Sequence, residues 1–151
     1  MGQIGRYVKA FLKVAFRHPV TGVTIIPRLP DGRIVLVRRR DTGQWSLPGG
    51  IVDWGHTFLQ TTERELQEET GLELIKIERL VGVYSSPDRD PRMHSIAVLL
   101  VVQAEGSLQI MDQEEVLEVQ AFTTTELPSE NLSHDHEQHL RDFLRGDVTI
   151  A

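Results

Sequence analysis

The sequence predicts an α+β fold: one domain, residues 1–151, that combines a β-sheet with helices. Two patterns favour this class. Runs rich in β-branched residues are bounded by turn residues, and separate segments repeat apolar residues at helical spacing. The sequence contains no internal repeat, linker or low-complexity tract, and a chain of this length can bury roughly 68–70% of its unfolded surface.

The composition excludes several classes of protein. With 40% hydrophobic and 25% charged residues, the chain has the average composition of a globular protein rather than that of a disordered or fibrous one. The absence of cysteine excludes thiol nucleophiles, zinc–thiolate sites and iron–sulfur clusters, which leaves carboxylates, histidines and hydroxyls for chemistry. A net charge of −6 is unlike the basic surface of proteins that bind a phosphate backbone, so we expect no nucleic-acid partner.

The first element is an amphipathic helix. Its apolar residues recur every three or four positions, with basic residues between them: Ile4, Tyr7, Val8, Phe11, Leu12 and Ala15. We expect this helix to pack on the domain or to contact a second copy in a homodimer. The apolar stretch is too short, and too interrupted by Lys9 and Lys13, for a signal peptide or a membrane span. We therefore expect a cytoplasmic protein with no membrane partner.

Strands are predicted next along the chain. Residues 23–26 and 34–37 flank an Asp31-Gly32 turn and predict a hairpin. Apolar, β-branched runs predict further strands at the following positions: 74–84, 96–102, 108–111 and 116–122. A final helix is predicted over 135–145, where Gly146 ends it.

The best-defined helix is predicted over 57–70, between a Pro48-Gly49-Gly50 segment and Gly71. On it, Glu65, Glu68 and Glu69 project from one face because they are three and four residues apart. They could form a solvated acidic face, since like-charge pairs at this spacing cost only about 0.2–0.5 kcal/mol each. They could instead hold a hard divalent cation such as Mg²⁺, which prefers oxygen ligands.

The segment from Gly50 to Leu72 resembles the Nudix box of the Nudix hydrolase family. That box reads glycine, five residues, glutamate, seven residues, then Arg-Glu-aliphatic-any-Glu-Glu-any-Gly-aliphatic. The matching residues are Gly50, Arg64, Glu65, Leu66, Glu68, Glu69, Gly71 and Leu72. His56 departs from the box, which has its first glutamate there. The resemblance extends loosely over most of the chain and implies a Nudix-type α/β/α sandwich with a central mixed β-sheet.

The resemblance also implies a metal site and an activity. Members of the family hydrolyse a nucleoside diphosphate linked to another moiety, with Mg²⁺ or alternatively Mn²⁺. Glu65 and Glu69 would be the principal ligands, and Glu68 would share the cluster. A carbonyl of Gly49 or Gly50 would add an oxygen, and Arg64 would hold a glutamate in place. With His56 in place of the box glutamate, a second or third metal ion would bind more weakly.

The general base is left open by the resemblance. Some relatives use a glutamate of the box, and others use a glutamate on a loop late in the sheet. In this chain the loop candidates are Glu114, Glu115 and Glu118, of which Glu115 or Glu118 is preferred. Each could equally be an ordinary loop charge.

The substrate expected from the resemblance is ADP-ribose, which would be cleaved to AMP and ribose 5-phosphate. Pro87 follows Leu72 by fifteen residues, a placement associated with the ADP-ribose pyrophosphatases of the family. Arg89 or Arg92 of the same loop could bind phosphate or ribose, although this loop could also be only a rigid turn. Arg39 or Arg40 is another candidate contact with the substrate.

Two alternatives remain. One is cleavage of an ordinary or oxidised nucleoside triphosphate to a monophosphate and pyrophosphate. The other, suggested by His56, is a catalytically silent module that senses nucleotides. The late histidines His134, His136 and His139 could bind a metal, but a solvated helix face is the preferred interpretation.

Overall fold

The computed structural model describes residues 3–151. The helices in this range are α1 (Gln3–Phe16), α2 (Phe58–Thr70) and α3 (His136–Arg145), with a short 3₁₀ turn, η1 (Pro87–Arg89). The strands are β1 (Val20–Arg28), β2 (Ile34–Arg39), β3 (Trp45–Ser46), β4 (Gly49–Ile51), β5 (Glu73–Tyr84), β6 (Ser95–Glu105), β7 (Val116–Phe122) and β8 (Thr149–Ile150).

The strands of the described range form one mixed sheet in the order β3-β2-β1-β6-β5-β8. The two longest-paired central strands, β1 and β6, run parallel, whereas β2 and β5 pair antiparallel to them. β4 also pairs with β1, and β7 also pairs with β2. β1 and β2 therefore each pair with three strands, and the sheet branches there. This arrangement confirms the expected α+β class and the predicted hairpin, which is β1–β2.

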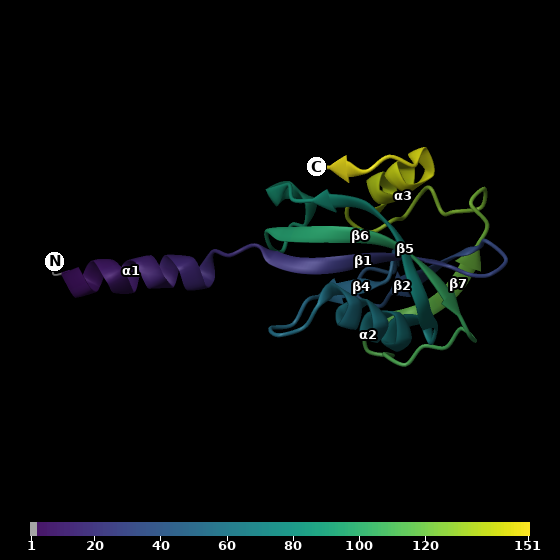
Figure 1. Ribbon diagram of the computed structural model, residues 1–151, viewed down its shortest axis with the longest axis horizontal. Helices are drawn as coiled ribbons and strands as arrows, with labels where there is room; N and C mark the ends of the chain where they lie inside the picture. Colours follow the sequence, from purple (N-terminus) through teal and green to yellow (C-terminus); the bar gives the residue numbers. More distant parts are fainter. Residues whose placement is uncertain (1–2) are drawn as a thin grey trace.

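Helices α2 and α3 cover opposite faces of the sheet (Figure 1). Leu66 of α2 is fully buried in one core cluster with Val23 and Val102. Leu140 of α3 is buried in the other, with Val81 and Tyr84. The sandwich therefore has an apolar layer on each side of the sheet, and the central strands are buried on both faces, as parallel pairs usually are.

Helix α2 begins and ends where the sequence predicts, because both of its termini are capped. The Thr57 hydroxyl accepts a hydrogen bond from the Gln60 N–H, and the Gln60 side chain accepts one from the Thr57 N–H. Gly71 adopts the left-handed conformation (φ 75°) that ends helices. These caps fix the length of the helix that carries the acidic residues.

Residues 108–111 are not a strand, so this prediction is wrong. The Gln109 N–H donates to the Thr70 carbonyl, and the Met111 N–H donates to the Glu68 carbonyl. The segment thus satisfies carbonyls of the last turn of α2, which have no partner within the helix. β3, β4 and β8 were not predicted, because they are too short to show an alternating pattern in the sequence.

Helix α1 forms as predicted, but it does not pack on the domain. It extends from the start of β1, away from the sheet and the other helices (Figure 1). Its apolar side chains between Ile4 and Val14 are exposed, including Ile4 at 79% and Phe11 at 70%. No helix of the described part of the chain is long and apolar enough to cross a membrane.

Candidate functional site

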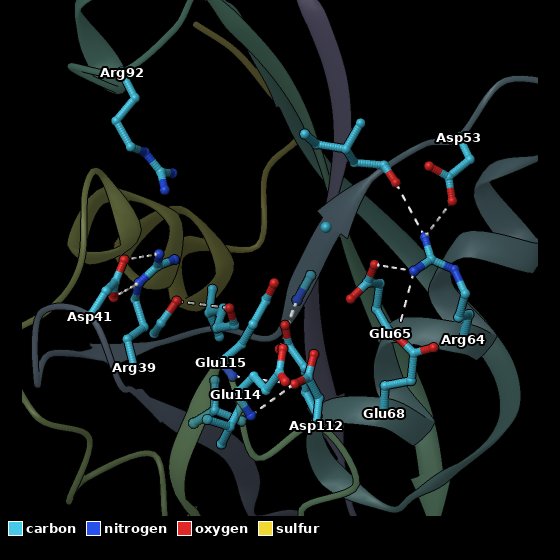
Figure 2. Close-up of a pocket in the computed structure, with 18 residues that line it drawn as sticks. Arg39, Asp41, Asp53, Arg64, Glu65, Glu68, Arg92, Asp112, Glu114 and Glu115 are labelled. Atoms are coloured by element: carbon cyan, nitrogen blue, oxygen red, sulfur yellow. Dashed lines mark hydrogen bonds and ion pairs between the residues drawn. The ribbon is translucent and has the colours of Figure 1, made fainter.

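A polar cleft of about 600 Å³ lies between the exposed face of α2, the end of β2 and the loop before β7. Figure 2 shows charged side chains reaching into it from three sides. Its charged lining residues are Arg39, Asp41, Asp53, Arg64, Glu65, Glu68, Glu69, Arg92, Asp112, Glu114 and Glu115. Carboxylates outnumber guanidinium groups in this set, as expected for a site that would need an added cation.

The floor of the cleft is made by Gly49 and Gly50, the start of β4. A Cβ on Gly49 would lie 2.2 Å from the Val23 carbonyl oxygen, and one on Gly50 would lie 2.2 Å from Glu65 Oε1. Glycine at both positions lets β4 approach β1 and lets the Glu65 carboxylate lie directly against the β4 backbone. The two glycines therefore bring the backbone of β4 next to the carboxylates, and the Gly49 N–H donates to Glu69 Oε2.

Arg64 holds the outer edge of the acidic cluster. Its Nη1 is 2.8 Å from Glu65 Oε1 and 3.5 Å from Glu68 Oε2. Its Nη2 is 3.3 Å from both Asp53 Oδ2 and the Ile51 carbonyl oxygen, to which it donates (Figure 2). One guanidinium group thus connects α2 to the loop after β4 and fixes the direction of the Glu65 carboxylate.

Glu65 and Glu69 are buried carboxylates, with 8% and 6% of their surface exposed. Burial raises the pKa of Glu65 to about 7, and the charges of Glu68 and Glu115 add to the increase. Burial and the charge of Glu65 raise the pKa of Glu69 well above its usual range, despite a hydrogen bond of 3.3 Å from the Gly49 N–H. The charge of Arg64 lowers the pKa of Glu65 but does not cancel the effect of burial, so both carboxylates stay costly to ionise unless a further cation binds.

This donor set fits a hard divalent cation. All the candidate ligands are oxygens, from carboxylates and from the backbone of the glycine segment, and Mg²⁺ and Mn²⁺ favour such ligands. A bound cation would remove the electrostatic cause of the raised pKa values. Glu68 lies nearer the solvent, its side chain 45% exposed, so it can contribute at the rim of the cluster.

The two loop glutamates preferred from the sequence lie in different places. Glu115 lines the cleft, and its charge acts on both Glu65 and Glu69. Glu118 lies on β7, where its carboxylate pairs with Arg38 at 3.3 Å, and it does not line the cleft. The structure thus brings Glu115, but not Glu118, to the acidic cluster.

Asp112 was missed as a candidate site residue. Its Oδ1 accepts hydrogen bonds from the N–H groups of Glu114 and Glu115, at 3.1 and 3.2 Å. Its own N–H donates to the Glu68 carbonyl of α2 over 2.8 Å. Asp112 therefore ties the loop with Glu115 to the end of the acidic helix. An Asp two residues before Glu114 and three before Glu115 is the sequence signal of such a turn.

Two arginines reach the cleft from the side opposite α2, and each is paired with a carboxylate two residues away. Arg39 forms a bidentate pair with Asp41, at 2.9 and 2.7 Å, and Arg92 forms one with Asp90, at 3.0 and 2.9 Å. Within residues 3–151, Nη1 of neither arginine has a hydrogen-bond acceptor. These nitrogens are available to an anion in the cleft (Figure 2).

The other two predicted arginines lie outside the cleft. The Arg89 side chain is 9% exposed, makes a bidentate pair with Asp135 at 2.9 and 3.0 Å, and donates to Ser95. Arg40 donates to the Gln113 carbonyl oxygen over 2.8 Å on the outside of the loop. Of the four arginines expected to bind substrate, Arg39 and Arg92 line the cleft and Arg89 and Arg40 do not.

Of the late histidines, His136 and His139 are buried rather than solvated, whereas His134 is exposed. His136 Nδ1 accepts a hydrogen bond from the Leu47 N–H at 3.0 Å, and His139 lies 3.1 Å from Asp135. Asp135, His136 and His139 have the composition of a metal site. Arg89, however, already occupies both oxygens of Asp135. We conclude that these residues anchor the segment leading to Gly49.

His56, the departure from the box, is exposed at the start of α2. Its Nδ1 lies 3.9 Å from Asp53, and it does not line the cleft. Compared with the family box, the chain therefore lacks a carboxylate just before the start of α2, but it keeps Glu65 and Glu69.

Comparisons with known proteins agree with this geometry. A family model described as NUDIX domain matches residues 18–145. The chain is 37% identical to an ADP-ribose pyrophosphatase of Methanocaldococcus jannaschii, over 86% of this chain and 76% of that protein. It is 36% identical to a putative 8-oxo-dGTP diphosphatase of Bacillus subtilis, over 86% of this chain and 85% of that protein.

Among solved structures, the fold is similar to the NUDIX domain of Shewanella oneidensis NrtR, which was crystallised with ADP ribose. The TM-score is 0.77 at 23% identity, over 96% of this chain and 98% of that one. At this identity the likeness concerns the fold alone.

Proposed function

Because this chain belongs to the NUDIX domain family, we propose that it hydrolyses the diphosphate linkage of ADP-ribose, with Mg²⁺, to AMP and ribose 5-phosphate. The observation that carries the proposal is the buried pair Glu65 and Glu69, held against Gly49 and Gly50. Two adjacent carboxylates with raised pKa values mark a position where positive charge is missing.

In this proposal, Glu65, Glu69 and a carbonyl oxygen of Gly49 or Gly50 hold the cation, with Glu68 at the rim. A bound Mg²⁺ would neutralise charge on the diphosphate and lower the pKa of a water molecule that attacks phosphorus. Arg64 positions Glu65 through their 2.8 Å ion pair. Arg39 and Arg92 bind phosphate oxygens through their free Nη1 groups, because a planar guanidinium suits that geometry.

The proposed general base is Glu115. It lines the same cleft as the metal ligands, and Asp112 fixes its loop against α2. A general base must lie within hydrogen-bond reach of the water from which it takes a proton, and a carboxylate on the wall of the cleft can meet this requirement. The proton of the attacking water passes to Glu115, and the P–O bond to the leaving phosphate breaks.

ADP-ribose is the preferred substrate for two reasons. The 37% identical relative is named as an ADP-ribose pyrophosphatase, and the cleft is large enough for a dinucleotide-sized ligand. In addition, Arg92 comes from the loop whose Pro87 has the family's ADP-ribose placement.

The second candidate is hydrolysis of a nucleoside triphosphate at the same site. It is supported by the putative 8-oxo-dGTP diphosphatase of Bacillus subtilis, which is nearly as similar in sequence. The acidic cluster serves either reaction, because both cleave between phosphates. What differs is the group that binds beyond the second phosphate.

The test is a panel assay of the full chain with ADP-ribose, dinucleotides, dGTP and 8-oxo-dGTP, each with Mg²⁺ and with Mn²⁺. We expect ADP-ribose to give AMP and ribose 5-phosphate in a metal-dependent reaction. Preferential release of pyrophosphate from a triphosphate would replace this proposal with the second candidate. Binding of ADP-ribose with no product from any substrate would identify a nucleotide sensor.

A further inference from the structure

Helix α1 has a wide apolar face with no partner in the domain. Ile4, Tyr7 and Phe11 are 79%, 73% and 70% exposed, and Val8, Leu12 and Val14 are also exposed. The helix stands clear of the sheet and of α2 and α3 (Figure 1). Single exposed apolar residues are normal on protein surfaces, but a contiguous group on one helix marks an interaction surface.

The apolar and basic residues of α1 lie on different sides of the helix. At 100° per residue, the apolar positions cover roughly half of the circumference. The apolar positions on this side are Ile4, Tyr7, Val8, Phe11, Leu12 and Val14. Arg6 and Lys9 lie on the other side and are exposed. Such a helix can lie with one face in an apolar phase and the other in water.

The charge of this segment is opposite to that of the rest of the chain. Residues 3–18 contain four of the sixteen Lys and Arg residues and none of the 22 Asp and Glu residues, the first of which is Asp31. The remainder of the chain therefore carries twelve basic residues against 22 acidic ones. An anionic surface would attract α1 and repel the domain behind it.

We propose that α1 binds flat on an anionic lipid surface, with its apolar face in the headgroup region and its basic residues facing lipid phosphates. This proposal is independent of the hydrolytic function. The expectation of no membrane partner came from the short length of the apolar stretch in this helix. That length excludes a helix that spans the bilayer, but not one that lies in the interface between the bilayer and water. Interfacial helices combine a large apolar face with Lys and Arg on the polar side.

A second copy of the chain fits α1 less well. Paired helices bury a narrow apolar seam and commonly flank it with opposite charges. The apolar face of α1 is wider than such a seam, and the helix has no acidic residue to pair with the Arg6 or Lys9 of another copy. Lipid phosphates supply the negative charge that a second α1 lacks.

The experiment is flotation of the full chain with vesicles of phosphatidylcholine alone or mixed with phosphatidylglycerol. We expect binding to the mixed vesicles only, and weaker binding at high salt. In the Arg6→Gln/Lys9→Gln variant we expect roughly 25-fold weaker partitioning, since each basic residue contributes roughly fivefold. The Ile4→Ser/Phe11→Ser variant should not float. Ala10→Gln, a change on the polar side of the helix, is the matched control and should float like the wild type.

Hydrolysis of nucleotides by each variant checks that the domain is folded, because none of these residues lines the cleft. The proposal is overturned if the wild type does not float at low salt, or if it floats equally with uncharged vesicles. It is also overturned if the wild type is a dimer by light scattering, the Ile4→Ser/Phe11→Ser variant is a monomer, and neither binds vesicles. That result would assign the apolar face to a second copy.

Discussion

The Glu65 carboxylate occupies the space that a side chain at Gly50 would need: a Cβ there would lie 2.2 Å from Glu65 Oε1. The flexible end of a glutamate can move aside at little cost to folding. We therefore expect Gly50→Ala to leave the thermal midpoint close to that of the wild type, while displacing Glu65 and lowering turnover at least tenfold. Steady-state kinetics and thermal unfolding measured on the same preparations check this.

Gly49→Ala provides the contrasting case. Its Cβ would meet the Val23 carbonyl oxygen of β1, which is backbone and cannot rotate away. We expect this variant to lose stability through the β1–β4 pairing. If Gly50→Ala unfolded as readily as Gly49→Ala or remained fully active, either result would contradict the view that the position of the Glu65 carboxylate depends on the absence of a side chain at Gly50.

Glu69→Gln should stabilise the metal-free protein at pH 8. The folded-state pKa of Glu65 is about 7, and that of Glu69 is also raised, against an ordinary value of 4.5. Between about pH 4.5 and 7 the folded state therefore binds more protons than the unfolded state, and stability falls as the pH rises. The Glu69→Gln variant has no charge at this position, so it keeps part of the stability that the wild type loses as the pH rises. Its thermal midpoint in EDTA should therefore be a few degrees above that of the wild type.

The same variant should respond differently to metal and to pH. Mg²⁺ should raise the midpoint of the wild type but not that of Glu69→Gln, and the difference between the two proteins in EDTA should disappear near pH 5. A metal-free variant that is less stable than the wild type at pH 8 would show that the Glu69 charge is balanced by groups already present.

Glu115 and Glu118 form a matched pair for locating the general base. Loss of a general base typically costs about 10²–10⁴-fold in turnover, so Glu115→Gln should lower kcat by that order. Glu118→Gln should change kcat little, because its carboxylate pairs with Arg38 outside the cleft. Near-normal kcat in Glu115→Gln would move the role of base to a glutamate of α2.

Arg89 and Arg92 lie in one loop but should have different effects on substrate binding, because only Arg92 lines the cleft. Arg92 lines the cleft with half of its side chain exposed, so Arg92→Ala should raise KM for ADP-ribose about tenfold. It also leaves the buried Asp90 without its bidentate partner, so the free energy of unfolding should fall by about 1–3 kcal/mol. Arg89→Ala leaves the Asp135 side chain, which is 14% exposed, with only His139 beside it. This variant should lower the free energy of unfolding by up to about 3 kcal/mol and leave KM unchanged.

Chemical denaturation and substrate kinetics of both variants separate these two effects. A raised KM in Arg89→Ala, or a normal KM in Arg92→Ala, would contradict the division between a structural and a substrate-binding arginine.

The sequence predicts those parts of the fold that depend on local signals. The limits of α2 follow from Thr57, Gln60 and Gly71, and the β1–β2 hairpin follows from the Asp31-Gly32 turn. Likewise, the spacing of Glu65 and Glu69 places both on one helix face before any tertiary contact is known. The resemblance to the family box further predicts that the glycine segment, Gly49 and Gly50, belongs to the same site as these two glutamates.

Features that depend on tertiary contacts could not be predicted in this way. Residues 108–111 look like a strand, but they cap the end of α2 through Gln109 and Met111. The choice between Glu115 and Glu118 depends on the register of β7, and the burial of His136 depends on how α3 packs beside Leu47. Nothing in the local sequence distinguishes Arg89, which pairs with a residue 46 positions away, from Arg92.

The most direct test of the account is Mn²⁺ binding, measured by electron paramagnetic resonance with the non-hydrolysable α,β-methylene analogue of ADP-ribose. The wild type should bind Mn²⁺ with the analogue, and the Glu65→Gln/Glu69→Gln variant should bind the metal at least tenfold more weakly while remaining folded. Unchanged Mn²⁺ affinity in that variant would show that these carboxylates do not hold the cation, and would contradict the proposed site.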